Sequence, residues 1–141
     1  MPARIASLIA NEGTSNALEG AIPKLAQLLE HDRNVEVAYL CTESAVQVCK
    51  LSDEGAHFCG YRNMQTLLLA LASPPVLCPA AARFKHKPTV AQLQEMIEEA
   101  WRQGHNAHGS IQTGGIRGTR KHVGTSEVQC ATIDFEKFAD P

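Results

Sequence analysis

Among the residues that could do chemistry, Cys59 has the most favourable place in the sequence. It follows the loop of residues 51–56 and stands where an apolar helical pattern begins. The start of a helix offers unpaired backbone N–H groups and the positive end of the helix dipole. Both favour a thiolate, which is the nucleophilic form of cysteine. A cysteine hydrolase needs its nucleophile in such a place, but most cysteines there are packing residues, so the spacing leaves both interpretations open.

The helix that carries Cys59 is predicted to run through the core. Four apolar residues recur at the spacing of one buried helical face: Met64, Leu67, Leu68 and Leu71. The helix should end at Ser73, because the two prolines that follow cannot continue it.

The remaining cysteines indicate reduced thiols and no metal site. The chain has five cysteines and six histidines, without a Cys-x-x-Cys motif or a paired spacing between the two types. We therefore expect neither a zinc site nor a cofactor, and a place in the cytoplasm or the nucleus. Cys41 and Cys49 are interpreted as structural thiols, buried or half-buried, and Cys78 receives no role.

Composition excludes several classes of partner. The chain has 141 residues, enough for one domain, with 44% hydrophobic and 20% charged residues. A net charge of -2 and a pI of about 6.3 give no reason to expect a nucleic-acid partner. No apolar run is long enough to span a bilayer, and residues 1–5 lack a sustained apolar signal region, so we expect neither a membrane partner nor secretion.

The elements upstream of Cys59 are predicted to be two helices and two strands. Residues 3–11 favour a short helix, and residues 20–30 a second one whose apolar stripe faces the core: Ile22, Leu25, Leu28 and Leu29. Residues 35–41 alternate as a strand that is apolar on both faces, which predicts that both faces are covered. Residues 45–49 indicate a second, short strand.

Downstream of Cys59, an exposed connection over residues 74–88 precedes the clearest helix, over residues 89–103. Thr89 and Gln92 have the spacing of a capping box, and Gly104 closes the helix. Its buried face is predicted from the apolar spacing: Val90, Leu93, Ile97, Ala100 and the core anchor Trp101. Its solvated side is predicted to carry Glu95, Glu98 and Glu99.

Residues 106–124 are rich in glycine and carry three cations, Arg117, Arg120 and Lys121. Such a loop could bind phosphate, but no strand precedes it and no Gly-Lys-Ser/Thr sequence ends it. No aromatic residues are interleaved with the cations, as a nucleic-acid patch would require. A structured loop beside a site is the better interpretation. Residues 130–135 then favour a strand, and residues 136–141 a frayed end.

The sequence from Phe58 to Leu68 resembles the Cys-Gly-Tyr-Arg-Asn-x-Gln-x-Leu signature of a family of papain-like cysteine peptidases. This family includes the ubiquitin-fold-modifier-specific proteases and the zinc-finger deubiquitinases. Residues 35–41, 93–101 and 113–125 also resemble it, in the same order, so the resemblance extends over about residues 20–135. We divide the chain into an N-terminal segment, residues 1–19, and a partial catalytic domain, residues 20–141.

The resemblance implies an α/β (α+β) papain-like fold with the nucleophile helix packed on a small sheet. It also implies a thiol protease that cleaves after the C-terminal glycine of ubiquitin or a ubiquitin-like modifier, with conjugates of these modifiers as partners. Cys59 falls on the nucleophile position. In that chemistry a histidine relays the proton, an acidic residue orients the histidine, and a backbone N–H with a polar side chain stabilises the oxyanion.

The sequence also departs from the family. The catalytic histidine and aspartate of the family follow the glycine-rich stretch in a region that this sequence does not contain, so we expect a truncated and impaired catalytic domain. The helix that relatives carry near residues 127–130 is expected to be nearly absent, and no zinc-finger spacing precedes the domain. Possible substitutes for the missing pair, none at the family's histidine position, are His57, His105, His108 and His122, with Asp134 to orient one of them.

Three functions remain open from the sequence. The first is a deubiquitinase or modifier-specific protease. The second is an inactive relative that at most binds ubiquitin or ubiquitin-like proteins. The third, an unrelated redox sensor, would need a resolving cysteine near Cys59, and none is close in sequence.

Overall fold

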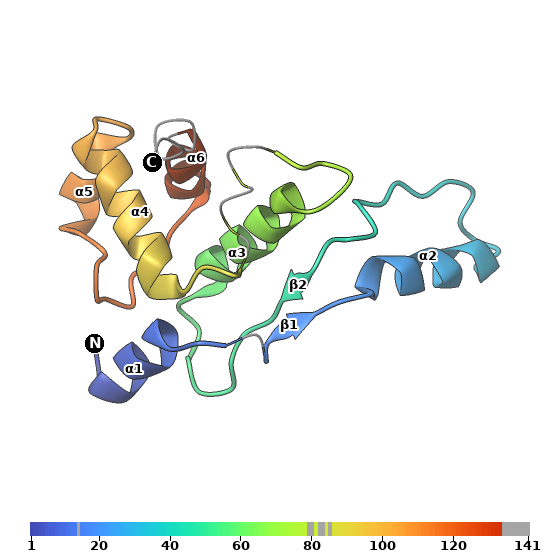
Figure 1. Cartoon of the computed structure of the whole chain (residues 1–141), viewed down its shortest axis with the longest axis horizontal. Coiled ribbons are helices and arrows are strands. Elements are labelled where there is room, and N and C mark those ends of the chain that lie inside the picture. Colours follow the sequence, from blue (N-terminus) through green and yellow to red (C-terminus); the bar gives the residue numbers. More distant parts are fainter. Residues whose placement is uncertain (14, 79–80, 82–83, 85, 134–141) are drawn as a thin grey trace.

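The computed structural model describes residues 1–13, 15–78, 81, 84 and 86–133. Within these residues the chain forms helices and two short strands (Figure 1). In chain order they are α1 (Ala3–Ala10), β1 (Ala17–Leu18), α2 (Ala21–His31), β2 (Gln47–Val48), α3 (Cys59–Ala72), α4 (Val90–Arg102), α5 (Ala107–Thr113) and α6 (Thr125–Ile133). No helix in this described part is long and apolar enough to cross a membrane.

Helix α4 lies at the centre of the packed body and contacts α1, α3, α5 and α6. It begins with the predicted capping box, in which the Thr89 side chain accepts a hydrogen bond from the backbone of Gln92 and Gln92 reciprocates. All five residues of its predicted apolar face are buried. Trp101 is 4% exposed, which confirms its role as a core anchor. A short amphipathic sequence with its own cap was enough to predict this helix.

Helix α3 begins at Cys59 and runs through the core, as predicted, but its buried face is rotated from the expected one. Met64 and Leu68 are fully buried, whereas Leu67 is 41% exposed. The place expected for Leu67 and Leu71 is taken by Tyr61 and two polar side chains, Arg62 and Gln65. Apolar spacing could not reveal this. A charged residue is rarely buried unless a partner from elsewhere in the chain pairs with it, and the spacing of apolar residues does not show such a partner.

The sheet consists of β1 and β2, which pair antiparallel with Ala17 opposite Val48. Strand β2 confirms the predicted short strand at residues 45–49, in shorter form, and it packs against α3. Val48 is buried, and its N–H donates to Thr66 Oγ1 at 3.0 Å. A helix that begins at Cys59 and packs on a small sheet is the α+β arrangement that the family resemblance implied.

Helix α2 forms where predicted, but the expectation that its apolar stripe packs into the core is wrong. The helix buries no residue, and Leu28 is 65% exposed. Figure 1 shows α2 on an arm beyond β1 and β2, well away from α4. Periodicity defines an apolar face, but only the path of the chain decides whether another element reaches that face.

Residues 35–41 do not form a strand, contrary to the prediction. Val37 is 69% exposed and Tyr39 is 94% exposed. Cys41, and Cys49 after β2, are exposed thiols rather than buried or half-buried ones. A strand needs a neighbour for its backbone hydrogen bonds, and no described residue pairs with this segment.

Residues 125–133 form α6, whereas a strand was predicted from residue 130 and this helix was expected to be nearly absent. Local bonds start the helix, because Gly124 N–H donates to Glu127 Oε2 at 2.8 Å and Val128 N–H to Gly124 O at 3.2 Å. An acidic residue in the first turn also suits the helix dipole. The rest of the predicted strand and the predicted frayed end lie outside the described residues.

The connection between α3 and α4 is only partly exposed. Its first part, Pro74 to Leu77, is exposed as predicted, whereas Ala81 and Pro88 are buried. The chain therefore returns to the body before α4 begins.

Candidate active site

Cys59 is the first residue of α3, and its thiol is free and exposed. The preceding residue, Phe58, is fully buried, and its carbonyl oxygen accepts a hydrogen bond from Arg62 N–H at 3.0 Å. A buried residue therefore holds the helix start in place while the next residue presents its thiol to solvent. The predicted position of Cys59 at a helix start is confirmed.

Two pockets meet at Cys59 and Asn63. The β2 pocket, about 310 Å³, lies on the sheet side and is lined by Gln47, Val48, Cys49, Lys50, Glu54, Gly55, Ala56, Cys59, Arg62 and Asn63. The α6 pocket, about 350 Å³, is lined by Cys59, Gly60, Asn63, Met64, Leu67, Val123, Gly124, Thr125 and Val128. Cys59 is therefore reached by a pocket on the β2 side and by another on the α6 side.

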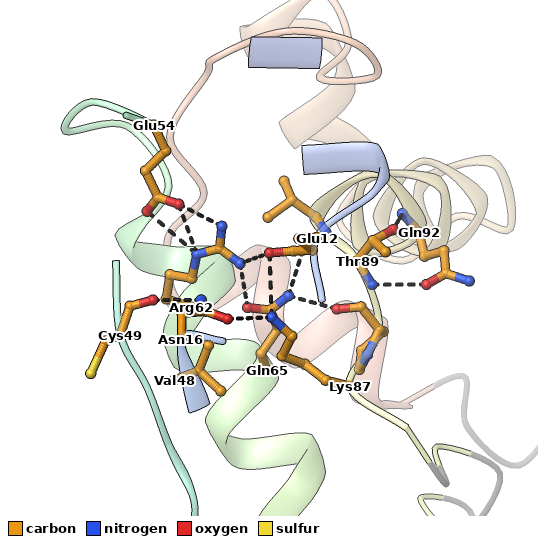
Figure 2. Close-up of polar contacts among 12 residues, drawn as sticks. Glu12, Asn16, Val48, Cys49, Glu54, Arg62, Gln65, Lys87, Thr89 and Gln92 are labelled. Atoms are coloured by element: carbon orange, nitrogen blue, oxygen red, sulfur yellow. Dashed lines mark hydrogen bonds and ion pairs between the residues drawn. The ribbon is translucent and has the colours of Figure 1, made fainter. Parts of the chain in front are cut away.

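The loop before Cys59 is tied to α3 by a buried ion pair. The carboxylate of Glu54 accepts hydrogen bonds from Arg62 Nε at 3.2 Å and from Arg62 Nη2 at 2.5 Å (Figure 2). Both side chains are at most 4% exposed. Burial lowers the pKa of Arg62, but hydrogen bonds to Glu54 and Glu12 outweigh it and raise the pKa overall. The guanidinium thus stays charged and keeps its carboxylate partners.

The glycine-rich loop, residues 114–124, is organised by two polar side chains of α4. Glu98 Oε1 accepts from the N–H groups of Ile116 at 2.6 Å and Arg117 at 3.2 Å. Gln94 Oε1 accepts from Gly118 N–H at 2.9 Å. The prediction that Glu98 belongs to the solvated side is wrong, since it is half-buried and serves this loop. Because these N–H groups already have acceptors, the loop is not built as a phosphate cradle.

The end of the same loop packs against the first turn of α3. The OH group of the buried Tyr61 donates to Lys121 O at 3.4 Å. Burial raises the pKa of Tyr61 to about 12, so the phenol keeps its proton at neutral pH. Val123, also buried, lies against Gly60. Residues 114–124 thus form a structured loop beside Cys59, as predicted, whereas the first part of the predicted loop, residues 107–113, is helix α5.

Two of the histidines considered from sequence come together near Cys59. His57 Nδ1 lies 3.3 Å from His122 Nε2, although the two residues are far apart in the chain. None of the four histidines lines either pocket at Cys59. His105 lies between α4 and α5, His108 lies in α5, and Asp134 lies outside the described residues. No described side chain hydrogen-bonds to the Cys59 thiol. Nor do three described His, Cys, Asp or Glu residues form a group that could hold a metal.

Sequence analysis missed the two carboxylates that pair with the buried Arg62, Glu12 and Glu54. One signal was available. Arg62 and Gln65 stand one turn apart beside the buried Met64, which places polar groups on an otherwise apolar face. Such a pair implies buried partners, but it does not say which acidic residues they are.

Comparison with known proteins decides the family. The model of peptidase family C78 matches residues 34–136. The chain belongs to this family. It is 33% identical over 93 residues to the zinc finger-containing ubiquitin peptidase 1 proteins of Rattus norvegicus and Mus musculus, and 31% identical to that of Homo sapiens. Each match covers 59% of this chain and 16% of the relative, so the chain spans about a sixth of the length of these relatives.

The family resemblance predicted from Phe58 to Leu68 is thereby confirmed. Family C78 is a family of cysteine peptidases. The nucleophile role of Cys59 and the division at residues 19 and 20 stay predictions, although α1 of the N-terminal segment packs against α4 in the same body as α3.

Proposed function

We propose that this C78 chain is part of a cysteine peptidase that cleaves conjugates of ubiquitin or a ubiquitin-like modifier, with Cys59 as its nucleophile. One observation carries the proposal: an exposed thiol at the first residue of a buried helix, between two pockets, in a chain of this family. The names of its relatives, ubiquitin peptidases, suggest the substrate class. The cytosol or the nucleus, where thiols stay reduced, is the proposed place of action.

The proposed reaction follows thiol protease chemistry. The Cys59 thiolate attacks the carbonyl carbon of the modifier's C-terminal glycine, and the bond to the leaving amine breaks as that amine takes up a proton. Water then hydrolyses the thioester and restores the thiol. The first N–H groups of a helix have no acceptor within it, so the first turn of α3 is the natural stabiliser of the oxyanion.

A second candidate function, binding without hydrolysis, is favoured by a different observation. His57 and His122 hydrogen-bond to each other and not to the thiol. Without a base, only a few per cent of a cysteine is ionised near neutral pH. We therefore propose that residues 1–141 by themselves bind the modifier and cleave its conjugates only slowly.

The first proposal is tested with an electrophilic probe made from ubiquitin and a second made from a ubiquitin-like modifier. The wild-type chain should form a covalent adduct that is lost in Cys59→Ala. The matched control is Cys49→Ala, which removes another exposed thiol from the β2 pocket and should leave the adduct intact. Absence of any Cys59-dependent adduct with both probes contradicts the proposal, and an adduct lost only in Cys49→Ala moves the reactive thiol to residue 49.

The second candidate is tested by titrating unmodified ubiquitin into Cys59→Ala. Saturable binding, together with slow cleavage of ubiquitin chains by the wild type, supports binding without hydrolysis. Rapid cleavage by the wild-type chain would rule it out.

A further inference from the structure

Glu12 lies outside the residues matched by the family model, yet its side chain is fully buried beside α3. It forms an ion pair with Arg62 and accepts from Gln65 Nε2 at 2.9 Å. It also accepts from the N–H of Val90, the first residue of α4, at 2.6 Å. Lys87 Nζ lies 3.5 Å from the same carboxylate. One side chain of the N-terminal segment thus joins α3 to the start of α4.

Arg62 is shared between two carboxylates that come from different parts of the chain. Figure 2 shows its guanidinium between Glu54 and Glu12, with Gln65 and Lys87 close by. Two acidic and two basic side chains, each at most 4% exposed, balance one another in this buried cluster: Glu12, Glu54, Arg62 and Lys87. Loss of one of them would leave an unpaired charge without water, which favours displacement of its partner.

Two members of the cluster flank the candidate nucleophile in the sequence. Glu54 and Arg62 are eight residues apart, and Cys59 stands between them. Their ion pair links the loop before Cys59 to helix α3, which presents the thiol. This ion pair forms only when the Arg62 side chain points toward Glu54. Glu12 holds that side chain from the opposite side, and Arg62 Nη1 also donates to Gln65 Oε1 at 2.7 Å.

We propose that Glu12 is a positioning residue for the Cys59 thiol, acting through Arg62, so that the N-terminal segment is part of the nucleophile site. This inference rests on the proposed function. A side chain that only stabilised the fold would affect the melting temperature without changing the reaction of the folded protein. A positioning residue also changes how well the thiol meets a large, oriented substrate, since small displacements of a reacting atom reduce rates strongly.

The test compares two reactions of Cys59 in the full chain, both well below the melting temperature found by circular dichroism. The first is alkylation by iodoacetamide, a small reagent that approaches a thiol from many directions. The second is adduct formation with the ubiquitin-derived probe. The variants are Glu12→Gln and Glu12→Asp. The matched control is Glu95→Gln, because Glu95 is an exposed carboxylate that is likewise paired with an arginine, Arg117.

Glu12→Gln should slow the probe reaction on the order of tenfold or more, while alkylation changes much less. Glu12→Asp keeps the buried charge but cannot reach Arg62 and Val90 together, so it should react at an intermediate rate. Glu95→Gln should behave as the wild type.

Wild-type probe rates in a folded Glu12→Gln variant would overturn the inference, as would equal losses in both reactions. If Glu12→Gln does not fold, the Glu12→Asp rates decide in the same way. Absence of an adduct in the wild type would instead be a failure of the proposed function.

Discussion

The carbonyl oxygen of Val123 lies so close to Gly60 that a β-carbon on Gly60 would be 2.4 Å from it. The Val123 side chain would be 2.8 Å from the same β-carbon. Real β-carbons do not approach backbone atoms so closely, so residue 60 must be glycine for the loop and α3 to meet beside Cys59. The glycine of the signature therefore has a packing reason as well as a place next to the thiol.

Gly60→Ala is expected to destabilise the protein by about 1–3 kcal/mol, because the clash with backbone outweighs the higher helix propensity of alanine. It should also slow labelling of Cys59 by the ubiquitin probe. Urea unfolding and labelling rates measure the two effects. Gly13→Ala is the control, since Gly13 is exposed with nothing within 4 Å of an added β-carbon. If the two variants are equally stable, the close contact is wrong.

Glu98 and Glu95, both on α4, allow a matched comparison of two substitutions. Glu98→Ala removes the acceptor of two backbone N–H groups and should cost about 1–3 kcal/mol. Glu95→Ala removes only an exposed ion pair to Arg117 and should cost less than about 1 kcal/mol. Thermal unfolding measures both, and hydrogen exchange of the Ile116 amide should accelerate in the Glu98 variant alone. Equal losses would show that Glu98 does not organise the loop.

The exposed position of α2 predicts that its apolar stripe contributes little to stability. Leu28→Ser should change the free energy of unfolding by no more than about 0.5 kcal/mol. Leu68→Ala, in the core on α3, should cost about 2–5 kcal/mol. Chemical denaturation of the two variants compares them, and a large loss in Leu28→Ser would mean that α2 packs against the body after all.

The raised pKa of the buried Tyr61 predicts that the protein loses stability in alkali. The unfolded chain releases the phenolic proton near pH 10, whereas burial holds it in the folded protein until about pH 12. The folded state therefore binds more protons across this interval, and the free energy of unfolding falls as the pH rises through it, by about 2 kcal/mol. Below about pH 9 this contribution is constant.

Tyr61→Phe removes the titrating group and should remove this part of the pH dependence. Urea unfolding at about pH 9 and about pH 11.5 compares the variant with the wild type. An identical decline in both proteins would assign the alkaline loss to other residues.

Short-range signals were enough to predict α4 and the helix start at Cys59. A capping box, an apolar stripe and a terminating glycine or proline act within a few residues, so their effect does not depend on the rest of the chain. The signature from Phe58 to Leu68 also indicated the family. What followed from local chemistry alone was therefore the position of the candidate nucleophile on its helix.

The tertiary structure decided which residues surround that thiol. Arg62 and Glu12 are 50 residues apart, and nothing in their separate neighbourhoods selects this pair over other arginines and carboxylates. In the tertiary structure, α2 and residues 35–41 also stay exposed despite their apolar patterns. Burial of a charge, or of an apolar face, depends on which distant segment arrives to cover it, and that is settled only when the whole chain has packed.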